Sequence, residues 1–309
     1  MDLSKLSNAD KAKLVKGLTG LVDMKKNTPS VYYEPHVNGQ LQFHEADHRY
    51  RFMFPGNRFG KTTAMGVEVD LVLQGSTRFG KLRDVPAQVL WFAPQLRQFE
   101  VLKKQLDSEC LTQGYAFDAN DFRFTWPNGS QLWIVPHDRD WKNIQGINPD
   151  LICCDEQPPK TLWNELQARG FGKKVTRYVI AATATEGISW MDGMFYKPWV
   201  KHHAMQGLDI DAAMKVQSHP TIWLWPKGGI ADNPSISDSE KKRFAELDWV
   251  GGAKERAVRT GGGFQSWLGD GLFDDAALDR IRERMRELDK ITGVGRNGTF
   301  AVKELNDAG

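Results

Sequence analysis

One stretch of the sequence, residues 52–63, constrains the fold more than any other. It reads FMFPGNRFGKTT: an apolar run, a Pro-Gly turn, and a GKT triplet at 60–62 where apolar residues begin to recur at helical spacing. Strand, glycine turn and helix in this order are typical of a loop that binds phosphate with its backbone N–H groups. The usual spacing has a glycine where Pro55 stands, and here Gly56 follows one residue later.

A second element, residues 151–156, supplies the acidic groups that a nucleotide-hydrolysing site needs. It reads LICCDE, an apolar strand that ends in two carboxylates. At the tip of a strand next to the phosphate loop, Asp155 is placed to hold Mg²⁺. Glu156 is then placed to orient and deprotonate the attacking water.

A third element, residues 179–185, reads VIAATAT and is a buried strand that ends in small hydroxyl residues. Hydroxyl groups at such a strand end can sense the γ-phosphate and pass its loss to the following segment. In phosphate loops the lysine, here Lys61, places a positive charge beside the terminal phosphates. The hydroxyl of the next residue, here Thr62, binds Mg²⁺. The three elements in this order predict ATP hydrolysis, with ATP and Mg²⁺ as ligands.

The remaining patterns predict an α/β fold with a mainly parallel sheet and helices on both faces. We expect further strands at 87–93 and 177–182, and a hairpin whose strands, at 122–126 and 131–135, flank an Asn-Gly turn. Helical periodicity indicates helices at 62–69, 96–111, 237–247 and 275–288. The predicted organisation is a helical arm at 1–30, a core at 31–226, a small lid or linker subdomain at 227–275 and a connecting segment at 276–309.

Composition narrows the class of protein but not its ligand. The formal net charge is only +2 and argues neither for nor against nucleic acid. An apolar run of the length that spans a membrane is missing from the sequence, which predicts no membrane association. Three cysteines, two of them adjacent, do not make a disulfide framework and favour a reducing, intracellular compartment.

The strings PGNRFGKT, IQGINPDLICCDEQPP and AATATEGISW together resemble the ATPase domain of the large terminase subunit, the DNA-packaging motor of tailed bacteriophages. Phosphate loops of this family commonly depart from the strict spacing and carry an arginine inside, as Arg58 does here. An Asp-Asn-Pro at 232–234 and the string RAVRTGGGF fit as well. The resemblance covers residues 40–275 and implies a RecA-like P-loop NTPase fold with a small C-terminal lid.

The resemblance implies roles for individual residues. The phosphate-binding group is implied to be Gly56, Asn57, Arg58, Gly60, Lys61, Thr62 and Thr63. Thr62 and Asp155 would hold Mg²⁺, and Glu156 would be the catalytic carboxylate, assisted by Lys61 and Arg58. Thr183 and Thr185 would couple hydrolysis to motion. Motors of this kind also use an arginine from a neighbouring subunit; some terminases have it where Gln145 stands, which leaves Arg139 and Arg123 as candidates here.

The same resemblance implies partners and a place of action. The chain would drive double-stranded DNA into a preformed capsid, as a ring of copies on the portal protein together with the small terminase subunit, in the host cytoplasm. We expect the isolated chain to be a monomer. The segment after residue 274 is too short for the family's nuclease domain, so we expect a chain limited to the motor domain, without nuclease activity. A motor that naturally lacks the nuclease is the alternative.

Other functions remain open. The string HEADH at 44–48 matches the H-E-x-x-H pattern of zinc hydrolases, although the strand expected at residue 51 leaves little room for their active-site helix. A DNA helicase, or another nucleic-acid translocase, shares the order of the three elements but needs a second nucleotide-binding-type domain. A small-molecule kinase accounts for the phosphate loop alone.

Overall fold

The computed structural model describes residues 7–93, 95, 99–137, 146–170, 175–183, 189–249 and 252–263. The chain divides into two compact units, Met1–Phe264 and Gln265–Gly309, and all described residues belong to the first. The predicted helix at 275–288 and the predicted connecting segment at 276–309 therefore lie outside the described residues.

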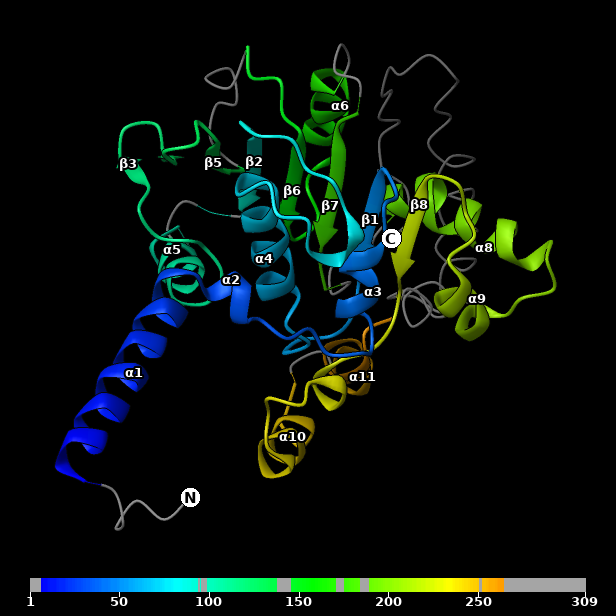
Figure 1. Ribbon diagram of the computed structural model, residues 1–309. Helices are drawn as coiled ribbons and strands as arrows, with labels where there is room; N and C mark the ends of the chain where they lie inside the picture. Colours follow the sequence, from blue (N-terminus) through cyan, green and yellow to red (C-terminus); the bar gives the residue numbers. More distant parts are fainter. Residues whose placement is uncertain are drawn as a thin grey trace, which may run out of the picture. The chain divides into compact units, whose positions relative to one another are not determined.

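An eight-stranded sheet runs through this unit, in the order β3-β4-β5-β2-β6-β7-β1-β8 (Figure 1). Its strands are β1 (Tyr50–Met53), β2 (Gln88–Ala93), β3 (Ala116–Asp118), β4 (Arg123–Thr125), β5 (Gln131–Pro136), β6 (Leu151–Asp155), β7 (Arg177–Ala181) and β8 (Ile222–Trp225). Among these described strands, β3–β4 and β4–β5 pair antiparallel and every other neighbouring pair is parallel. The prediction of a mainly parallel sheet is confirmed.

Strands β4 and β5 form the antiparallel hairpin that the Asn-Gly pair in the sequence predicted. The amide of Ser130 donates to the side-chain oxygen of Asn128 at 2.9 Å, and Gly129 takes a positive φ of 83°. These features close the loop between β4 and β5. Two strands escaped prediction: β3 is only three residues long, and β8 is a continuous apolar run, IWLW, that periodicity alone does not identify as a strand.

Helices cover both faces of the sheet. They are α1 (Asn8–Asn27), α2 (Pro29–Tyr32), α3 (Gln40–Glu45), α4 (Lys61–Leu73), α5 (Phe99–Glu109), α6 (Lys160–Arg169), α7 (Ser189–Met191), α8 (Lys197–Ala204), α9 (Ile210–Val216), α10 (Asp238–Ala245) and α11 (Gly252–Gly261). Three shorter helical segments are η2 (Arg78–Gly80), the π-helix η5 (Asp192–Tyr196) and η6 (Ile230–Asp232).

The alternation of side chains along β1 shows how the two faces are covered. Arg51 points to one face, where its guanidinium donates to the carboxylate of Glu68 on α4 at 2.9 Å. Phe52 points to the other face and packs edge to face against Trp163 of α6, with ring centroids 6.4 Å apart. Because successive residues of a strand face opposite sides, α4 and α6 lie on opposite faces of the sheet. The mixed α/β architecture is consistent with a P-loop NTPase fold.

Glu68 holds the α4 face together as a buried carboxylate among basic groups. Its oxygens lie 2.9 Å from Arg51, 2.9 Å from His44 Nδ1, 3.3 Å from Lys81 and 3.4 Å from Arg83. Burial alone raises the pKa of Glu68, but the charges of Arg51 and Lys81 outweigh burial and hold the pKa well below its usual value. The strand before the phosphate loop and the helix after it are thus joined by one ionised side chain.

The acidic strand lies one strand away from the strand that precedes the predicted phosphate loop. Residues 151–155 form β6, and β7 lies between β1 and β6. The register pairs Phe52 with Ile180 and Ile180 with Cys154, so the carboxyl ends of all three strands still meet at one edge. This edge of the sheet carries the polar residues described below.

The sequence-based predictions about membrane spans and disulfides can be compared with the structure. Within the described residues, no helix is both long enough and apolar enough to span a membrane. Cys110, Cys153 and Cys154 are free thiols, all of them buried.

Candidate functional site

The predicted phosphate loop, residues 54–60, connects β1 directly to α4. Gly60 is the residue before the helix and has a left-handed backbone with φ of 91°, which favours glycine. The Gly60 carbonyl accepts the N–H of Ala64 at 3.0 Å, whereas the N–H groups of the first helical residues have no intrahelical acceptor. Gly60 has no side chain to cap them, so the start of α4 offers several N–H groups to an anion.

Gln40, at the start of α3, contacts the last two residues of the loop. Its Nε2 donates to the carbonyls of Gly60 at 3.1 Å and Phe59 at 3.4 Å. Its Oε1 accepts from Tyr33 Oη at 2.9 Å and from the backbone N–H of His36 at 3.1 Å. The C=O and N–H of one trans peptide group point in opposite directions, so these bonds also fix the direction of the N–H groups of Gly60 and Lys61. Sequence reasoning missed Gln40, since no local pattern marks it.

Lys61 is the buried cation of the site, with 9% of its surface exposed. Its ammonium donates to the carbonyls of Pro55 at 2.8 Å and Gly56 at 3.0 Å, and to Thr183 Oγ1 at 2.9 Å. Burial lowers the pKa of Lys61 to about 8, against the raising effect of Glu156 and Asp155. The ammonium therefore remains mostly protonated at pH 7 and stays inside the protein, where its charge is little screened.

Asp155 and Thr62 face each other across the end of the sheet. Thr62 Oγ1 lies 3.4 Å from Asp155 Oδ1. Burial and the neighbouring Glu156 raise the pKa of Asp155 to about 7, and Lys61 offsets only part of this. A divalent cation bound beside Asp155 would favour the ionised carboxylate.

A hydroxyl and a carboxylate are hard oxygen donors of the kind that Mg²⁺ takes, with phosphate oxygens and waters completing its shell. Within the described residues, no group of three or more His, Cys, Asp or Glu side chains is arranged to hold a metal by itself. The donor set therefore fits an ion that binds together with a nucleotide rather than in a protein cage.

Glu156 and Thr183 link the ends of β6 and β7. The carboxylate of Glu156 accepts the backbone N–H of Thr183 at 3.0 Å, and Thr183 Oγ1 donates to Asn57 Oδ1 at 3.0 Å. Glu156 has a left-handed backbone with φ of 65°, an uncommon conformation for a residue with a side chain. Sparsely populated backbone conformations of this kind cluster at functional sites.

These groups surround one cavity of about 400 Å³. Its lining residues are Asn57, Arg58, Phe59, Gly60, Lys61, Thr62, Thr63, Gln105, Asp155, Glu156, Thr183, Asn233 and Ile236. The structure thus brings together most of the residues selected from the sequence. Gly56 is not in the lining; its carbonyl instead accepts a hydrogen bond from Lys61. Gln105 and Ile236 come from segments that sequence reasoning did not connect with the site.

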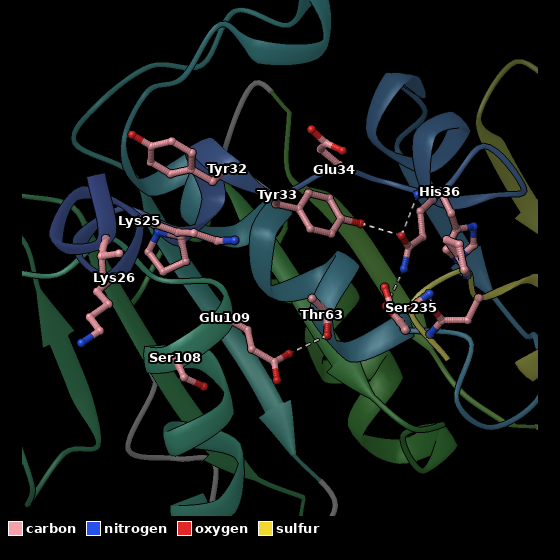
Figure 2. A pocket seen from close by; sticks show the side chains of 16 residues that line it. Lys25, Lys26, Tyr32, Tyr33, Glu34, His36, Thr63, Ser108, Glu109 and Ser235 are labelled. Carbon is pink, nitrogen blue, oxygen red and sulfur yellow. Dashed lines mark hydrogen bonds between the residues drawn. The ribbon is translucent and has the colours of Figure 1, made fainter. Parts of the chain in front are cut away.

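A second cavity, of about 980 Å³, adjoins the first and shares Gly60, Thr63 and Asn233 with it. Figure 2 shows side chains from the end of α1, from the segment after α2 and from α5 around it. Tyr33 points into the cavity toward Gln40, and Glu109 reaches Thr63 at 3.0 Å (Figure 2). Aromatic and polar groups thus continue outward from the phosphate loop.

Several predicted residues lie elsewhere. Thr185 and Arg139 fall outside the described residues, as does Gln145. Arg123 lies on β4 near the sheet edge, where its guanidinium is 3.3 Å from Asp118 and is absent from the cavity lining. A residue that acts on a neighbouring subunit is not expected in its own cavity, so a role for Arg123 in another copy remains a prediction.

The H-E-x-x-H string does not form a zinc site. Helix α3 ends at Glu45, so the two histidines do not share one helical face. His44 is buried and bonds Glu68 through Nδ1 at 2.9 Å, whereas His48 Nε2 lies 3.2 Å from the carbonyl of Gln217. The zinc-hydrolase alternative is therefore wrong, because each histidine has a separate structural partner.

Comparison with known proteins gives distant likenesses to solved structures. No protein family model matches the sequence, and no curated protein matches it. The large terminase of a thermophilic bacteriophage, in complex with ADP, aligns over 70% of this chain and 51% of its own, with 15% identity and a TM-score of 0.47. The HK97 bacteriophage large terminase aligns over 81% and 46%, with 10% identity and a TM-score of 0.44.

The bacteriophage phi-29 viral genome packaging motor assembly aligns over 53% of this chain and 51% of its own, with 15% identity and a TM-score of 0.34. These neighbours are large terminases and phage packaging motors, the family that the sequence motifs resemble. This chain spans about half the length of each of the three. At such identities and TM-scores, the likeness assigns no residue and no activity to this chain.

Proposed function

We propose that this chain is an ATP-hydrolysing motor domain that moves double-stranded DNA into a preformed capsid through the portal. The observation that carries the proposal is the single cavity shared by Lys61, Thr62, Asp155, Glu156 and Thr183. A buried cation, a hydroxyl–carboxylate pair and a second carboxylate are the groups that phosphoryl transfer from ATP to water requires.

Binding of the triphosphate rests on the phosphate loop and Lys61. The N–H groups at the start of α4 bind phosphate oxygens, and Gln40 keeps the loop in the shape that exposes them. Lys61 exchanges hydrogen bonds to two loop carbonyls and Thr183 for charge-assisted bonds to the terminal phosphates. Arg58, exposed at the cavity rim, adds a further positive charge.

Thr62 and Asp155 are the residues that would hold Mg²⁺. When bound, the ion neutralises charge on the phosphate oxygens. The protein's contribution is to place the hydroxyl and the carboxylate 3.4 Å apart at the base of the cavity, next to Lys61.

Glu156 is the residue that we assign to the attacking water. Its carboxylate lines the cavity and is oriented by the N–H of Thr183, so one oxygen is fixed and the group is held at the cavity wall. Thr183 is also bonded to Lys61 and Asn57, so loss of the γ-phosphate changes the surroundings of the end of β7 directly. Thr185 would extend this coupling to the following segment.

The second cavity is where we place the nucleoside. It begins at Gly60 and Thr63, the point at which a triphosphate leaves the phosphate loop, and it is large enough for a base and a ribose. The rings of Tyr33 and His36 lie on its wall. We expect ADP to bind more tightly than pyrophosphate, and this difference to shrink in Tyr33→Ala.

The partners follow from the proposed motor. Copies of the chain form a ring on the portal in the host cytoplasm, with the small terminase subunit delivering double-stranded DNA. Arg139 or Arg123 of one copy would stabilise transition-state charge in the next. The isolated chain is a monomer in this proposal. Sedimentation with and without the portal protein and DNA measures its oligomeric state.

The test is ATP turnover and nucleotide binding in four proteins. The wild type should hydrolyse ATP in the presence of Mg²⁺. Glu156→Ala should bind nucleotide but lose turnover, and Lys61→Ala should weaken both. Glu165→Ala is the matched control, because this glutamate lies on α6, is absent from the cavity lining and pairs with Arg169.

Retained turnover in Glu156→Ala would show that the catalytic carboxylate is assigned wrongly. Translocation is tested separately, by ATP-dependent protection of DNA from nuclease when portal-bearing capsids are added. Duplex unwinding by the isolated chain would favour the helicase alternative. Transfer of phosphate to a small molecule that survives Glu156→Ala would favour a kinase.

A further inference from the structure

The phosphate loop is held from a second side by backbone groups from the C-terminal part of the described chain. The N–H of Gly56 donates to the carbonyl of Gly228 at 2.8 Å, and the N–H of Asn57 donates to the carbonyl of Arg259 at 2.6 Å. Gly228 in turn donates to Gly261 at 2.8 Å. We call this arrangement of residues 56–57, 228–229 and 259–262 the glycine clasp.

Glycines make this approach possible because no side chain would fit. A Cβ on Gly56 would lie inside van der Waals contact with the carbonyl oxygen of Arg259, and one on Gly229 would clash with the carbonyl oxygen of Thr260. The backbone of Gly229 is extended, with φ of −175°, a conformation open to any residue. At Gly229 the requirement for glycine therefore comes from the nearby end of α11 and not from backbone strain.

The hydrogen bonds of the clasp satisfy groups that each segment would otherwise leave unpaired. Arg259 lies in the last turn of α11, where carbonyls have no intrahelical donor. The N–H of Asn57 meets this need, while the N–H of Gly262 bonds the carbonyl of Val258 at 2.9 Å. Val258 is fully buried, so the end of α11 is anchored in the core.

The clasp determines the direction of the first peptide groups of the loop. Asn57 is held through its backbone by Arg259 and through its side chain by Thr183, and the next carbonyl, of Arg58, accepts from Asn233 Nδ2 at 2.8 Å. The residues that follow, from Arg58 to Thr63, line the cavity. Gly229, Thr260 and Gly262 themselves are not in the cavity lining, so their effect on a ligand passes through the loop.

We propose that docking of α11 on the phosphate loop and nucleotide binding are thermodynamically linked, with Gly229 as a positioning residue. This inference rests on the proposed function, since it needs a nucleotide in the cavity. The docked end of α11 holds the loop in its binding form, and bound phosphate in turn tightens α11. Linkage is reciprocal, so an effect in one direction requires the same free energy in the other.

The experiment compares Gly229→Ala with Gly261→Ala. A Cβ on Gly261 meets nothing within 4 Å, so this variant makes the same chemical change in another segment of the clasp without the clash. Binding of Mg²⁺–ADP is measured by calorimetry. We expect Gly229→Ala to bind about tenfold more weakly than the wild type, within the usual range of coupling, and Gly261→Ala to bind like the wild type.

Hydrogen exchange provides the readout that a purely structural role would not move. In the wild type, saturating Mg²⁺–ADP should slow amide exchange at residues 256–263, and Gly229→Ala should lose this response while the amides of β2 and β6 stay protected. Where Gly229→Ala does not fold, the wild-type measurement decides alone. Unchanged exchange at 256–263 under saturating ADP overturns the inference.

The outcomes separate the inference from the proposed function. A wild type that binds no nucleotide, or a Lys61→Ala variant that binds as tightly as the wild type, contradicts the proposed function. A wild type that binds ADP while Gly229→Ala binds equally well, with the same response in exchange, contradicts the clasp and leaves the proposed function standing.

Discussion

The ammonium nitrogen of Lys61 lies 2.9 Å from the hydroxyl oxygen of Thr183, which joins the phosphate loop to the end of β7. The same hydroxyl donates to Asn57 at 3.0 Å, and the N–H of Thr183 donates to Glu156 at 3.0 Å. One residue therefore contacts the lysine, the loop and the candidate catalytic carboxylate. Lys61 and Glu156 are thus connected through the side chain and the backbone N–H of one residue.

This arrangement predicts that Thr183→Val lowers ATP turnover more than nucleotide affinity. Valine keeps the shape of the side chain but removes the acceptor for Lys61 and the donor to Asn57. Thr183 then no longer holds the loop and Glu156 in fixed positions relative to each other. Misplacement of a catalytic group commonly costs about a hundredfold in rate. Steady-state turnover and ADP titration measure the two effects. Thr183→Ser keeps the hydroxyl and should retain most of the activity; equal loss in both variants contradicts the prediction.

Asp155→Asn should shift the Mg²⁺ dependence of nucleotide affinity to higher Mg²⁺ concentrations. The amide cannot supply the charge that the carboxylate offers, and we expect the Mg²⁺ concentration needed for half-maximal ADP binding to rise at least about tenfold. ADP affinity in the presence of EDTA should not fall, because a negative charge near the phosphates has been removed. A variant with wild-type Mg²⁺ dependence would exclude Asp155 as a ligand.

Gln40→Ala should weaken nucleotide binding, because Gln40 holds two carbonyls of the loop and also lines the second cavity. It removes hydrogen bonds to the carbonyls of Phe59 and Gly60, and the loss of two such bonds, at about 0.5–1.5 kcal/mol each, corresponds to about fivefold to 150-fold in affinity at most. Gln42→Ala is the control on the same helix, since the Gln42 side chain accepts the N–H of Gly39, outside the predicted phosphate loop. Calorimetric titration with ADP should give a lower affinity for Gln40→Ala than for Gln42→Ala. Equal affinities would contradict a role for Gln40 in nucleotide binding.

Glu68→Gln should destabilise the fold by about 3–5 kcal/mol, because it leaves Arg51 buried without its countercharge. Urea unfolding followed by circular dichroism measures the free energy of unfolding. Glu165→Gln is the matched control: its pair with Arg169 is more exposed and should contribute no more than about 0.5 kcal/mol. Similar losses in the two variants would show that the buried carboxylate has no special role.

The contribution of Glu68 should also depend on pH. Its pKa in the folded protein lies well below the ordinary value of 4.5, so the wild type gains stability from this group above about pH 4.5. As pH falls below that value and through the folded pKa, the carboxylate is protonated and the gain is lost. The difference in unfolding free energy between the wild type and Glu68→Gln should therefore shrink in acid; a difference that is constant from pH 7 to pH 3.5 contradicts this account.

The candidate site was largely predictable because its groups occur at element boundaries with strong local patterns. An apolar run followed by Gly60-Lys61-Thr62 marks a strand, a turn and a helix, and carboxylates after the apolar run of β6 mark the end of a strand. The contributions of Gln40 and of the glycine clasp were not predictable. Their partners lie far away in the sequence, and nothing in the neighbouring residues distinguishes Gln40 from Gln42.

Local chemistry in the sequence was sufficient to locate the central strands, the start of α4 and the Asn-Gly hairpin, because glycine, proline and apolar spacing restrict the backbone residue by residue. Tertiary structure decided which strands are neighbours, that β7 separates β1 from β6, and that His44 serves Glu68 and not a metal. These outcomes depend on pairing and burial between distant segments. The free energies of strand pairing and burial arise only when the chain has folded. They therefore cannot be predicted from any short stretch of residues.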